Sequence, residues 1–168
     1  MMDNASILKI MSERRSRGRQ RTEPEESLVK YVVFTIGERP YALAADEVRE
    51  ISFDNELHYV PFLPPYVSGY ANRHGLPYTV LDLRVLFEKR ALDSRSLLIL
   101  NADDDQLALL VSGVDEIVKL PAASVHPLVS EEESARYFSN AITVKDREVF
   151  VLNLSTILRR LERDVERS

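Results

Sequence analysis

Arg73 and His74 have the side chains whose types and position allow the most specific chemistry in this sequence. They stand with Gly75 between two short apolar runs, residues 66–71 and 76–83. Aromatic and β-branched residues bounded by Gly, Asn and Pro are typical of two strands joined by a tight turn, where glycine takes a positive φ at little steric cost. We therefore expect a hairpin whose tip presents one arginine and one histidine.

The sequence gives little indication of a metal site or of a nucleophilic catalytic residue. The three histidines, His58, His74 and His126, are too far apart along the chain to match any local metal-ligand spacing. The chain has no cysteine, and it lacks the glycine-rich phosphate-binding motifs and the nucleophile-elbow motif. We expect no bound metal and no cofactor.

The acidic residues are also better explained without catalysis. An EF-hand loop that began at residue 103 would need glycine and glutamate where the chain has Ala108 and Val114, so residues 103–105 are expected to form an acidic turn. Residues 131–133, Glu-Glu-Glu, are expected in a solvated loop. Asp82 follows an apolar run, as a capping or hydrogen-bonded carboxylate does. No carboxylate pair is placed for acid–base work, so we expect a binding protein and not an enzyme.

Composition indicates a cytoplasmic protein with a core. The apolar fraction is 45% over 168 residues, enough for one domain or two very small ones. No run approaches the roughly 20 apolar residues of a membrane span, and the N-terminus lacks the apolar segment of a signal peptide. We expect no membrane insertion.

The charge is divided unevenly along the chain. Residues 1–22 carry +4 and residues 23–168 carry −9. Residues 1–27 are predicted to form a basic, disordered tail, with electrostatic contact to an acidic partner or an anionic lipid as the alternative. The acidic remainder is a poor match for a phosphate backbone, which argues against nucleic-acid binding.

The elements that must position these residues are mostly strands. Residues 28–36, 41–45 and 48–53 read as strands, and residues 83–89 as a short helix. A longer helix is predicted from residue 154, because apolar residues recur there at i, i+3, i+4, i+7 and i+11. Asn153 or Ser155 can cap it. We expect its apolar stripe to pack on the core, with an exposed partner-binding helix as the alternative.

The chain also repeats itself. Segment 31–51 aligns with segment 97–117 without a gap, and after a short insertion segment 80–83 aligns with segment 151–154. A repeat longer than one hairpin predicts two similar modules, each with about five short strands, as in a small barrel or sandwich. A barrel of that size is filled by its own side chains.

The central stretch, VPFLPPYVSGYANRHGLPYTVLDLRVLF, resembles the CheW-like family, the adaptor domain of bacterial chemotaxis. The resemblance implies an all-β fold of two five-stranded, SH3-like barrels packed side by side. We therefore expect residues 28–168 to form one CheW-like domain of two intertwined modules with a C-terminal helix. Where the family has arginine in this turn, the chain has His74, and Ser112 and Asn140 also depart from the usual pattern.

The resemblance further implies the partners: chemoreceptor cytoplasmic tips and the CheA histidine kinase, bound through the kinase's regulatory domain. Two alternatives stay open. One is a scaffold of a receptor–kinase pathway outside chemotaxis, which the three departures motivate. The other is a nucleic-acid-binding small β-barrel anchored by the basic tail.

The resemblance also places the receptor contact. Val48, Glu50 and Ile51 match the family's Val-x-Glu-Ile columns, and His74 matches its turn arginine, with Arg73 one place earlier. Strand alternation would put Val48 and Glu50 on one face, so we expect a partly buried carboxylate that needs a cation. An unperturbed imidazole titrates near about pH 6.5, unlike arginine, so binding through it would depend on pH. The expected protein-binding residues are thus Val48, Glu50, Ile51, Arg73 and His74, in a groove between the modules.

Overall fold

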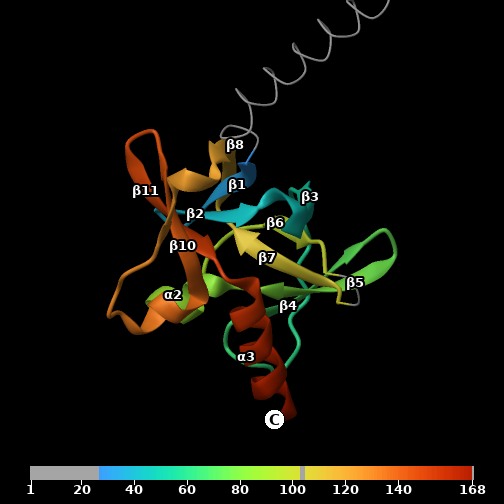
Figure 1. Ribbon diagram of the computed structural model, residues 1–168. Coiled ribbons are helices and arrows are strands. Elements are labelled where there is room, and N and C mark those ends of the chain that lie inside the picture. Colours follow the sequence, from blue (N-terminus) through green and yellow to red (C-terminus); the bar gives the residue numbers. More distant parts are fainter. Residues whose placement is uncertain (1–26, 103–104, 168) are drawn as a thin grey trace, which may run out of the picture.

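The computed structural model describes residues 27–102 and 105–167 of the chain. The predicted tail lies outside these residues apart from Ser27, and so does the predicted acidic turn apart from Asp105. About half of the described residues lie in strands, which form two sheets, as the predicted all-β fold requires (Figure 1).

The two sheets differ by one strand. The first has six strands in the order β8 (Gly113–Pro121), β1 (Leu28–Ile36), β2 (Arg39–Ala44), β11 (Arg147–Leu152), β10 (Phe138–Val144) and β9 (Val125–Pro127). The second has five strands in the order β3 (Val48–Ser52), β6 (Ser96–Leu100), β7 (Leu107–Val111), β5 (Leu76–Leu81) and β4 (Val67–Arg73). The sixth strand, β9, was not predicted as part of a barrel; it pairs along β10, whereas β4 has only an isolated bridge between Tyr70 and His58 in that place.

The register of the strands repeats as the sequence alignment of the two halves predicts. Val32 opposes Leu43 in the pair β1–β2, and the equivalent residues of the second repeat, Leu98 and Leu109, oppose each other in the pair β6–β7. The hairpins β4–β5 and β10–β11 match in the same way, including a bulge at the same place in each. The two repeats are therefore equivalent strand by strand, which confirms the predicted repeat.

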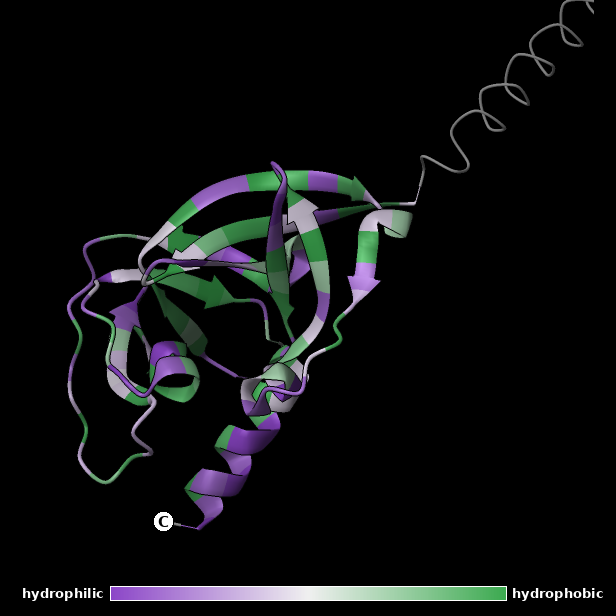
Figure 2. Cartoon of the chain, turned by 90° about the vertical axis from the view of Figure 1, so that its left-hand side faces the viewer, coloured by the Kyte–Doolittle hydropathy of each residue, from purple (hydrophilic) through white to green (hydrophobic). Residues whose placement is uncertain are grey.

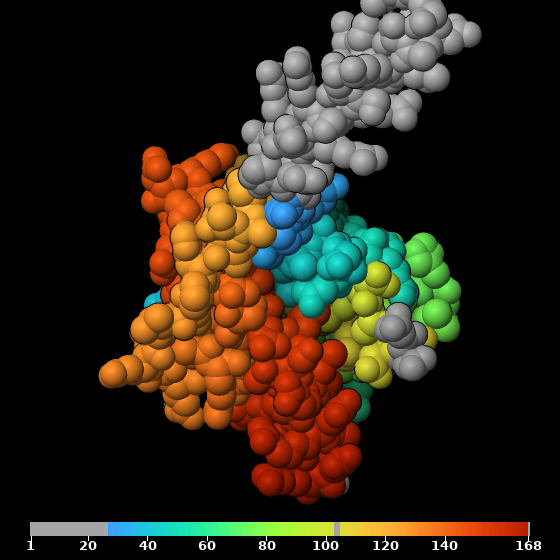
Figure 3. Space-filling model, in the orientation of Figure 1, coloured from blue at the N-terminus to red at the C-terminus, as the bar shows by residue number. Residues whose placement is uncertain are grey.

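Each sheet nevertheless contains strands from both repeats. β3, from the first repeat, pairs with β6 of the second, and β8 of the second pairs with β1 of the first. The parallel pairs β2–β11 and β5–β7 also join one repeat to the other. The space-filling view accordingly shows early segments, blue to cyan, packed directly beside later ones in yellow and orange (Figure 3). Neither half of the sequence forms a sheet alone.

One large core serves both sheets. It contains Phe34 and Leu43 from the first sheet together with Leu98 and Leu109 from the second, all fully buried. Burying each such side chain stabilises the fold by about 1.5–3 kcal/mol. A smaller apolar cluster lies within the first sheet, around Ile142.

The described residues include two α-helices, α2 (Leu83–Glu88) and α3 (Leu154–Glu166), and three short 3-10 helices, η1 (Ala45–Glu47), η2 (Ala122–Ser124) and η3 (Glu133–Tyr137). Ile157 of α3 is fully buried, and Leu154, Leu158 and Leu161 pack on the large core, as predicted. Val165, the last residue of the predicted stripe, is 45% exposed, because the end of the helix extends beyond the core. The rest of α3 is largely hydrophilic (Figure 2). No helix in the described part of the chain is long and apolar enough to cross a membrane.

Equivalent residues cap the two helices. Asp82 accepts hydrogen bonds from the backbone N–H of Arg84 at 3.1 Å and from that of Leu92 at 2.8 Å. Asn153, its equivalent in the second repeat, accepts one from the N–H of Thr156 at 3.2 Å. Burial raises the pKa of the Asp82 carboxyl, against the hydrogen bonds that favour its charged form. Both predicted capping roles are confirmed.

Removing the Asp82 cap should lower the free energy of unfolding more than removing the Asn153 cap does. Asp82→Ala leaves one buried and one partly buried N–H group without a partner, so we expect the free energy of unfolding to fall by about 2–3 kcal/mol. Asn153→Ala exposes one partly buried N–H and should cost about 1 kcal/mol. Urea unfolding of both variants measures the difference. Equal losses would mean that the bond from Leu92 adds nothing to stability.

Candidate functional site

The hairpin β4–β5 carries the predicted cations. Arg73, the last residue of β4, opposes Leu76, the first residue of β5, so only His74 and Gly75 form the turn. Both have positive φ, 51° and 79°, the backbone of a two-residue hairpin turn that matches the twist of the strands. A turn was predicted over residues 72–75; its second half is confirmed, but Asn72 and Arg73 belong to β4.

Glu50 lies on β3 beside a bulge. Val48 opposes Leu100 and Glu50 opposes Ile99, so two residues of β3 are set against one of β6 at this point. Directly opposed residues point to the same face of a sheet, and Leu100 and Ile99 point to opposite faces. The expectation that Val48 and Glu50 share a face is therefore wrong, because the bulge at Arg49 interrupts the alternation.

The bulge instead leaves the two apolar residues of the predicted site together. Ile51 opposes Leu98, which lies on the same face of β6 as Leu100, the partner of Val48. Val48 and Ile51 are partly buried and pack against the large core. They contribute to the core from one face of β3, while Glu50 lies on the other.

Glu50 joins the two outer strands of the second sheet. Its Oε1 forms an ion pair with the guanidinium of Arg73 on β4, and its Oε2 lies 3.6 Å from Nε2 of His74. Since β3 and β4 are the first and last strands of this sheet, the ion pair is a side-chain bridge between its two edges. The cation that the sequence required for Glu50 is thus supplied within the chain.

The three side chains of this cluster differ in exposure. Those of Glu50 and Arg73 are each 29% exposed, whereas that of His74 is 74% exposed. The Nε of Arg73 is buried and has no hydrogen-bond partner among the described residues. Glu50 and Arg73 are therefore held by each other, and His74 is the member of the cluster most open to a partner.

The first sheet carries an equivalent pair. Glu116 is the counterpart of Glu50 in the second repeat, Lys145 is the counterpart of His74, and their charged groups lie 3.1 Å apart. Lys145 also has a positive φ and occupies the turn between β10 and β11. A carboxylate on the third strand of each repeat and a cation at a hairpin turn thus face each other in both barrels.

The remaining histidines belong to packing or to the surface. The ring of His58 stacks on Tyr70 with centroids 4.8 Å apart, and the backbones of these residues exchange hydrogen bonds of 2.8 and 2.9 Å. His126 is exposed on β9. Among residues 27–102 and 105–167, no group of three potential ligands is placed to hold a metal ion.

Sequence reasoning missed a second polar cluster, around Arg160 of α3. Arg160 lies off the apolar stripe of its helix, yet its side chain lies between two tyrosines beside a cavity of about 1020 Å³. The spacing on one helix cannot show this, because both tyrosines come from distant segments. None of the five predicted binding residues lines this cavity.

Comparison with known proteins gives consistent matches. A family model described as a CheW-like domain matches residues 30–162. The chemotaxis protein CheW of Klebsiella aerogenes is 24% identical over 101 residues, which cover 58% of this chain and 61% of that protein. This chain therefore spans less than two thirds of the length of that relative. CheW of Helicobacter pylori is 26% identical over 144 residues, 82% of this chain and 86% of that protein.

A solved structure shares the fold. The crystal structure of the scaffolding protein TtCheW from Thermoanaerobacter tengcongensis aligns with a TM-score of 0.67 at 24% identity, covering 75% of this chain and 84% of that one. The family match spans both sheets and includes all five of the predicted binding residues.

Proposed function

The chain belongs to the CheW-like domain family, and on that premise we propose that it is a chemotaxis adaptor that binds chemoreceptor tips and a CheA-type histidine kinase at once. The observation that carries the proposal is the family match over residues 30–162, which includes both barrels and the Glu50 cluster. The adaptor acts by holding its partners together and performs no chemistry of its own. It works in the cytoplasm at receptor arrays, where both partners meet.

The shape of the molecule supports binding on more than one side. Both barrels present outer strands, and exposed large apolar side chains lie on several strands, such as Leu76 on β5 and Ile117 on β8. Exposed strands and apolar residues are surfaces that peptides and other domains recognise. The kinase's regulatory domain, itself a CheW-like module in this proposal, docks on barrel edges.

We place the receptor contact at the Glu50 cluster. His74 projects from the hairpin tip, while Glu50 and Arg73 are fixed behind it by their ion pair. Val48 and Ile51 add a partly buried apolar strip on the other face of the same strand. A receptor helix would contact His74 and the Glu50–Arg73 pair directly, and it would reach Val48 and Ile51 only along the outer edge of β3, where they remain partly exposed.

The test is the affinity of single-residue variants for a receptor-tip fragment. Glu50→Gln keeps a hydrogen-bond acceptor for Arg73 but removes the charge, and His74→Ala removes the exposed ring. Each should weaken receptor binding by about tenfold, or about 1.4 kcal/mol. The matched controls are Glu148→Ala and His126→Ala, at exposed positions of the first sheet, which should bind as the wild type does.

The same variants should bind the kinase's regulatory domain normally and melt within a few degrees of the wild type. Unchanged receptor affinity in both Glu50→Gln and His74→Ala would remove the receptor contact from this cluster. Failure of the wild-type chain to bind either a cognate receptor tip or a CheA regulatory domain would remove the adaptor function itself.

One departure from the family pattern has a structural role. The hydroxyl of Ser112 accepts a hydrogen bond from the backbone N–H of Gly37 at 2.8 Å, and so joins two loops of this chain. Asn140 occupies the position equivalent to Gly69 in the other repeat, next to β9. The departure at Ser112 therefore has a local structural explanation, and nothing in the structure explains Asn140. A pull-down that identifies the bound receptor and kinase decides between chemotaxis and the alternative pathway.

A further inference from the structure

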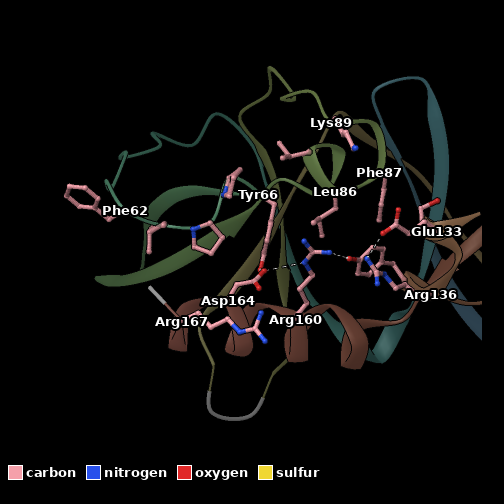
Figure 4. Close-up of a pocket in the computed structure, with 16 residues that line it drawn as sticks. Phe62, Tyr66, Leu86, Phe87, Lys89, Glu133, Arg136, Arg160, Asp164 and Arg167 are labelled. Carbon is pink, nitrogen blue, oxygen red and sulfur yellow. Dashed lines mark hydrogen bonds and ion pairs between the residues drawn. The ribbon is translucent and has the colours of Figure 1, made fainter.

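A cavity of about 1020 Å³ lies on the side of the molecule where α2 and α3 meet (Figure 4). Its walls come from the segment before β4, from α2, from η3 and from α3. The first two of these belong to the first repeat, and η3 and α3 belong to the second. The Glu50 cluster does not reach it.

The cavity is built by equivalent parts of the two repeats. Tyr66 and Tyr137 line it and occupy matching positions in the first and second repeat. The carbonyl of Tyr66 accepts the N–H of Asp82 at 2.6 Å, and that of Tyr137 accepts the N–H of Asn153 at 2.7 Å. Each tyrosine is thus fixed to the cap of the following helix.

Arg160 ties the two tyrosines together. Its guanidinium lies 5.7 Å from the centre of the Tyr66 ring and 5.9 Å from that of Tyr137, and it donates a hydrogen bond to the Tyr137 hydroxyl. Asp164 accepts hydrogen bonds from Arg160 at 3.3 Å and from the Tyr66 hydroxyl at 2.7 Å. The Tyr66 hydroxyl lowers the pKa of Asp164. The charges of Arg160 and Asp164 are therefore satisfied within the wall.

Other cations on the rim are not satisfied in this way. Lys89 and Arg167 line the cavity and make no ion pair with any described residue. Arg136 pairs at 3.3 Å only with Glu133, whose side chain is 87% exposed. The lining has four cations against two carboxylates, so the cavity attracts negative charge.

The opposite wall is apolar. Phe62 is 92% exposed and has a φ of 64°, an uncommon backbone for an aromatic residue, and Leu63 and Leu86 line the cavity beside it. The lining of the cavity thus combines apolar side chains with charged ones.

We propose that this cavity is a second protein-docking site, which takes an acidic peptide segment with a bulky apolar side chain from a partner protein. Apolar anchors lie against Phe62 and Leu86, while the segment's carboxylates pair with Lys89 and Arg167. The volume is at the upper limit of about 300–1,000 Å³ for small-molecule pockets, which favours a peptide. The chain's own segment 1–22 carries +4 and has the wrong sign to fill it. This site does not depend on the adaptor function proposed above.

The test is fluorescence anisotropy of the full-length protein with a fluorescein-labelled peptide, Asp-Glu-Leu-Phe-Glu-Asp. Two further peptides carry the same dye: one with its acids replaced by Asn and Gln, the other with Leu and Phe replaced by Ser. We expect the first peptide to bind saturably. We expect each of the other two to bind more weakly, by about tenfold or more. Added salt should weaken the first, because the rim contacts are charged.

Two variants of the protein locate the binding. Lys89→Glu and Phe62→Ser should each weaken binding of the acidic peptide by about tenfold. The matched controls are Lys119→Glu on β8, with the same change of charge, and Val129→Ser, which replaces a residue that is 94% exposed outside the cavity. Both controls should bind as the wild type does.

Three results would overturn the proposal. The first is an acidic peptide that does not bind at millimolar concentration, and the second is equal binding by Lys89→Glu and Lys119→Glu. The third is a wild-type dimer in sedimentation that Lys89→Glu or Phe62→Ser dissociates, since the occupant would then be a second copy of this chain. Receptor and kinase binding by Lys89→Glu is measured separately and should be unchanged.

Discussion

Replacing Gly69 with alanine is expected to lower the free energy of unfolding by about 3 kcal/mol or more. A Cβ on Gly69 would lie 2.0 Å from the carbonyl oxygen of His58 and 2.8 Å from its carbonyl carbon, both rigid backbone atoms. The φ of Gly69 is 135°, which L side chains rarely adopt. The bridge between His58 and Tyr70 holds these two segments together, so relief of the clash would break it.

Two other glycines serve as controls. Gly75 has a φ of 79° but open space around it, so Gly75→Ala should cost about 1 kcal/mol from backbone strain alone. Gly113 has open space and no positive φ, so Gly113→Ala should change stability by less than about 0.5 kcal/mol. Urea unfolding of the three variants ranks their free energies of unfolding. If Gly69→Ala lowered the free energy of unfolding no more than Gly75→Ala does, the close approach of the His58 backbone to Gly69 would be wrong.

Reversing one charge of the Glu50–Arg73 ion pair is expected to lower the free energy of unfolding by about 2 kcal/mol or more. Arg73→Glu would set two carboxylates together where each side chain is only 29% exposed, and Glu50→Arg would do the same with two cations. The double variant with both charges reversed restores an opposite pair and should recover most of the loss. A double-mutant cycle from unfolding measurements gives the coupling energy.

The control is the ion pair in the other barrel, whose carboxylate is the counterpart of Glu50 and whose cation is the counterpart of His74. Glu116 and Lys145 lie 3.1 Å apart, but the side chain of Lys145 is 81% exposed. Exposed pairs contribute about 0–1 kcal/mol, so reversing Lys145 should cost much less than reversing Arg73. Similar coupling in both pairs would show that the burial of Arg73 has no consequence for stability, and that the Glu50–Arg73 pair does not help to hold the two edges of the sheet together.

Local features of the sequence determined the elements. The hairpin turn at His74 and Gly75 and the caps at Asp82 and Asn153 were predicted where they occur, because turn and cap geometry depends on a few neighbouring residues. The internal repeat was visible in the sequence because equivalent strands need similar apolar patterns. The motif around the turn was enough to indicate the CheW-like family.

The predicted binding residues were only partly placed by the same reasoning. The sequence required a cation near Glu50 and offered Arg73 or His74; the structure pairs Glu50 with Arg73 and leaves His74 beside them, mostly exposed. Whether Val48, Glu50, Ile51, Arg73 and His74 bind a receptor remains a prediction that the variants above test.

Tertiary structure alone decided how the repeats combine and which faces their residues take. The exchange of β3 and β8 between repeats depends on pairing across distant segments, which strand patterns do not specify. The bulge at Arg49 moved Glu50 to the face opposite Val48, since one extra residue in a strand reverses every later face. Arg160 lies between Tyr66 and Tyr137 for the same reason: its neighbours are set by the packing of two repeats, and no spacing along one helix encodes that.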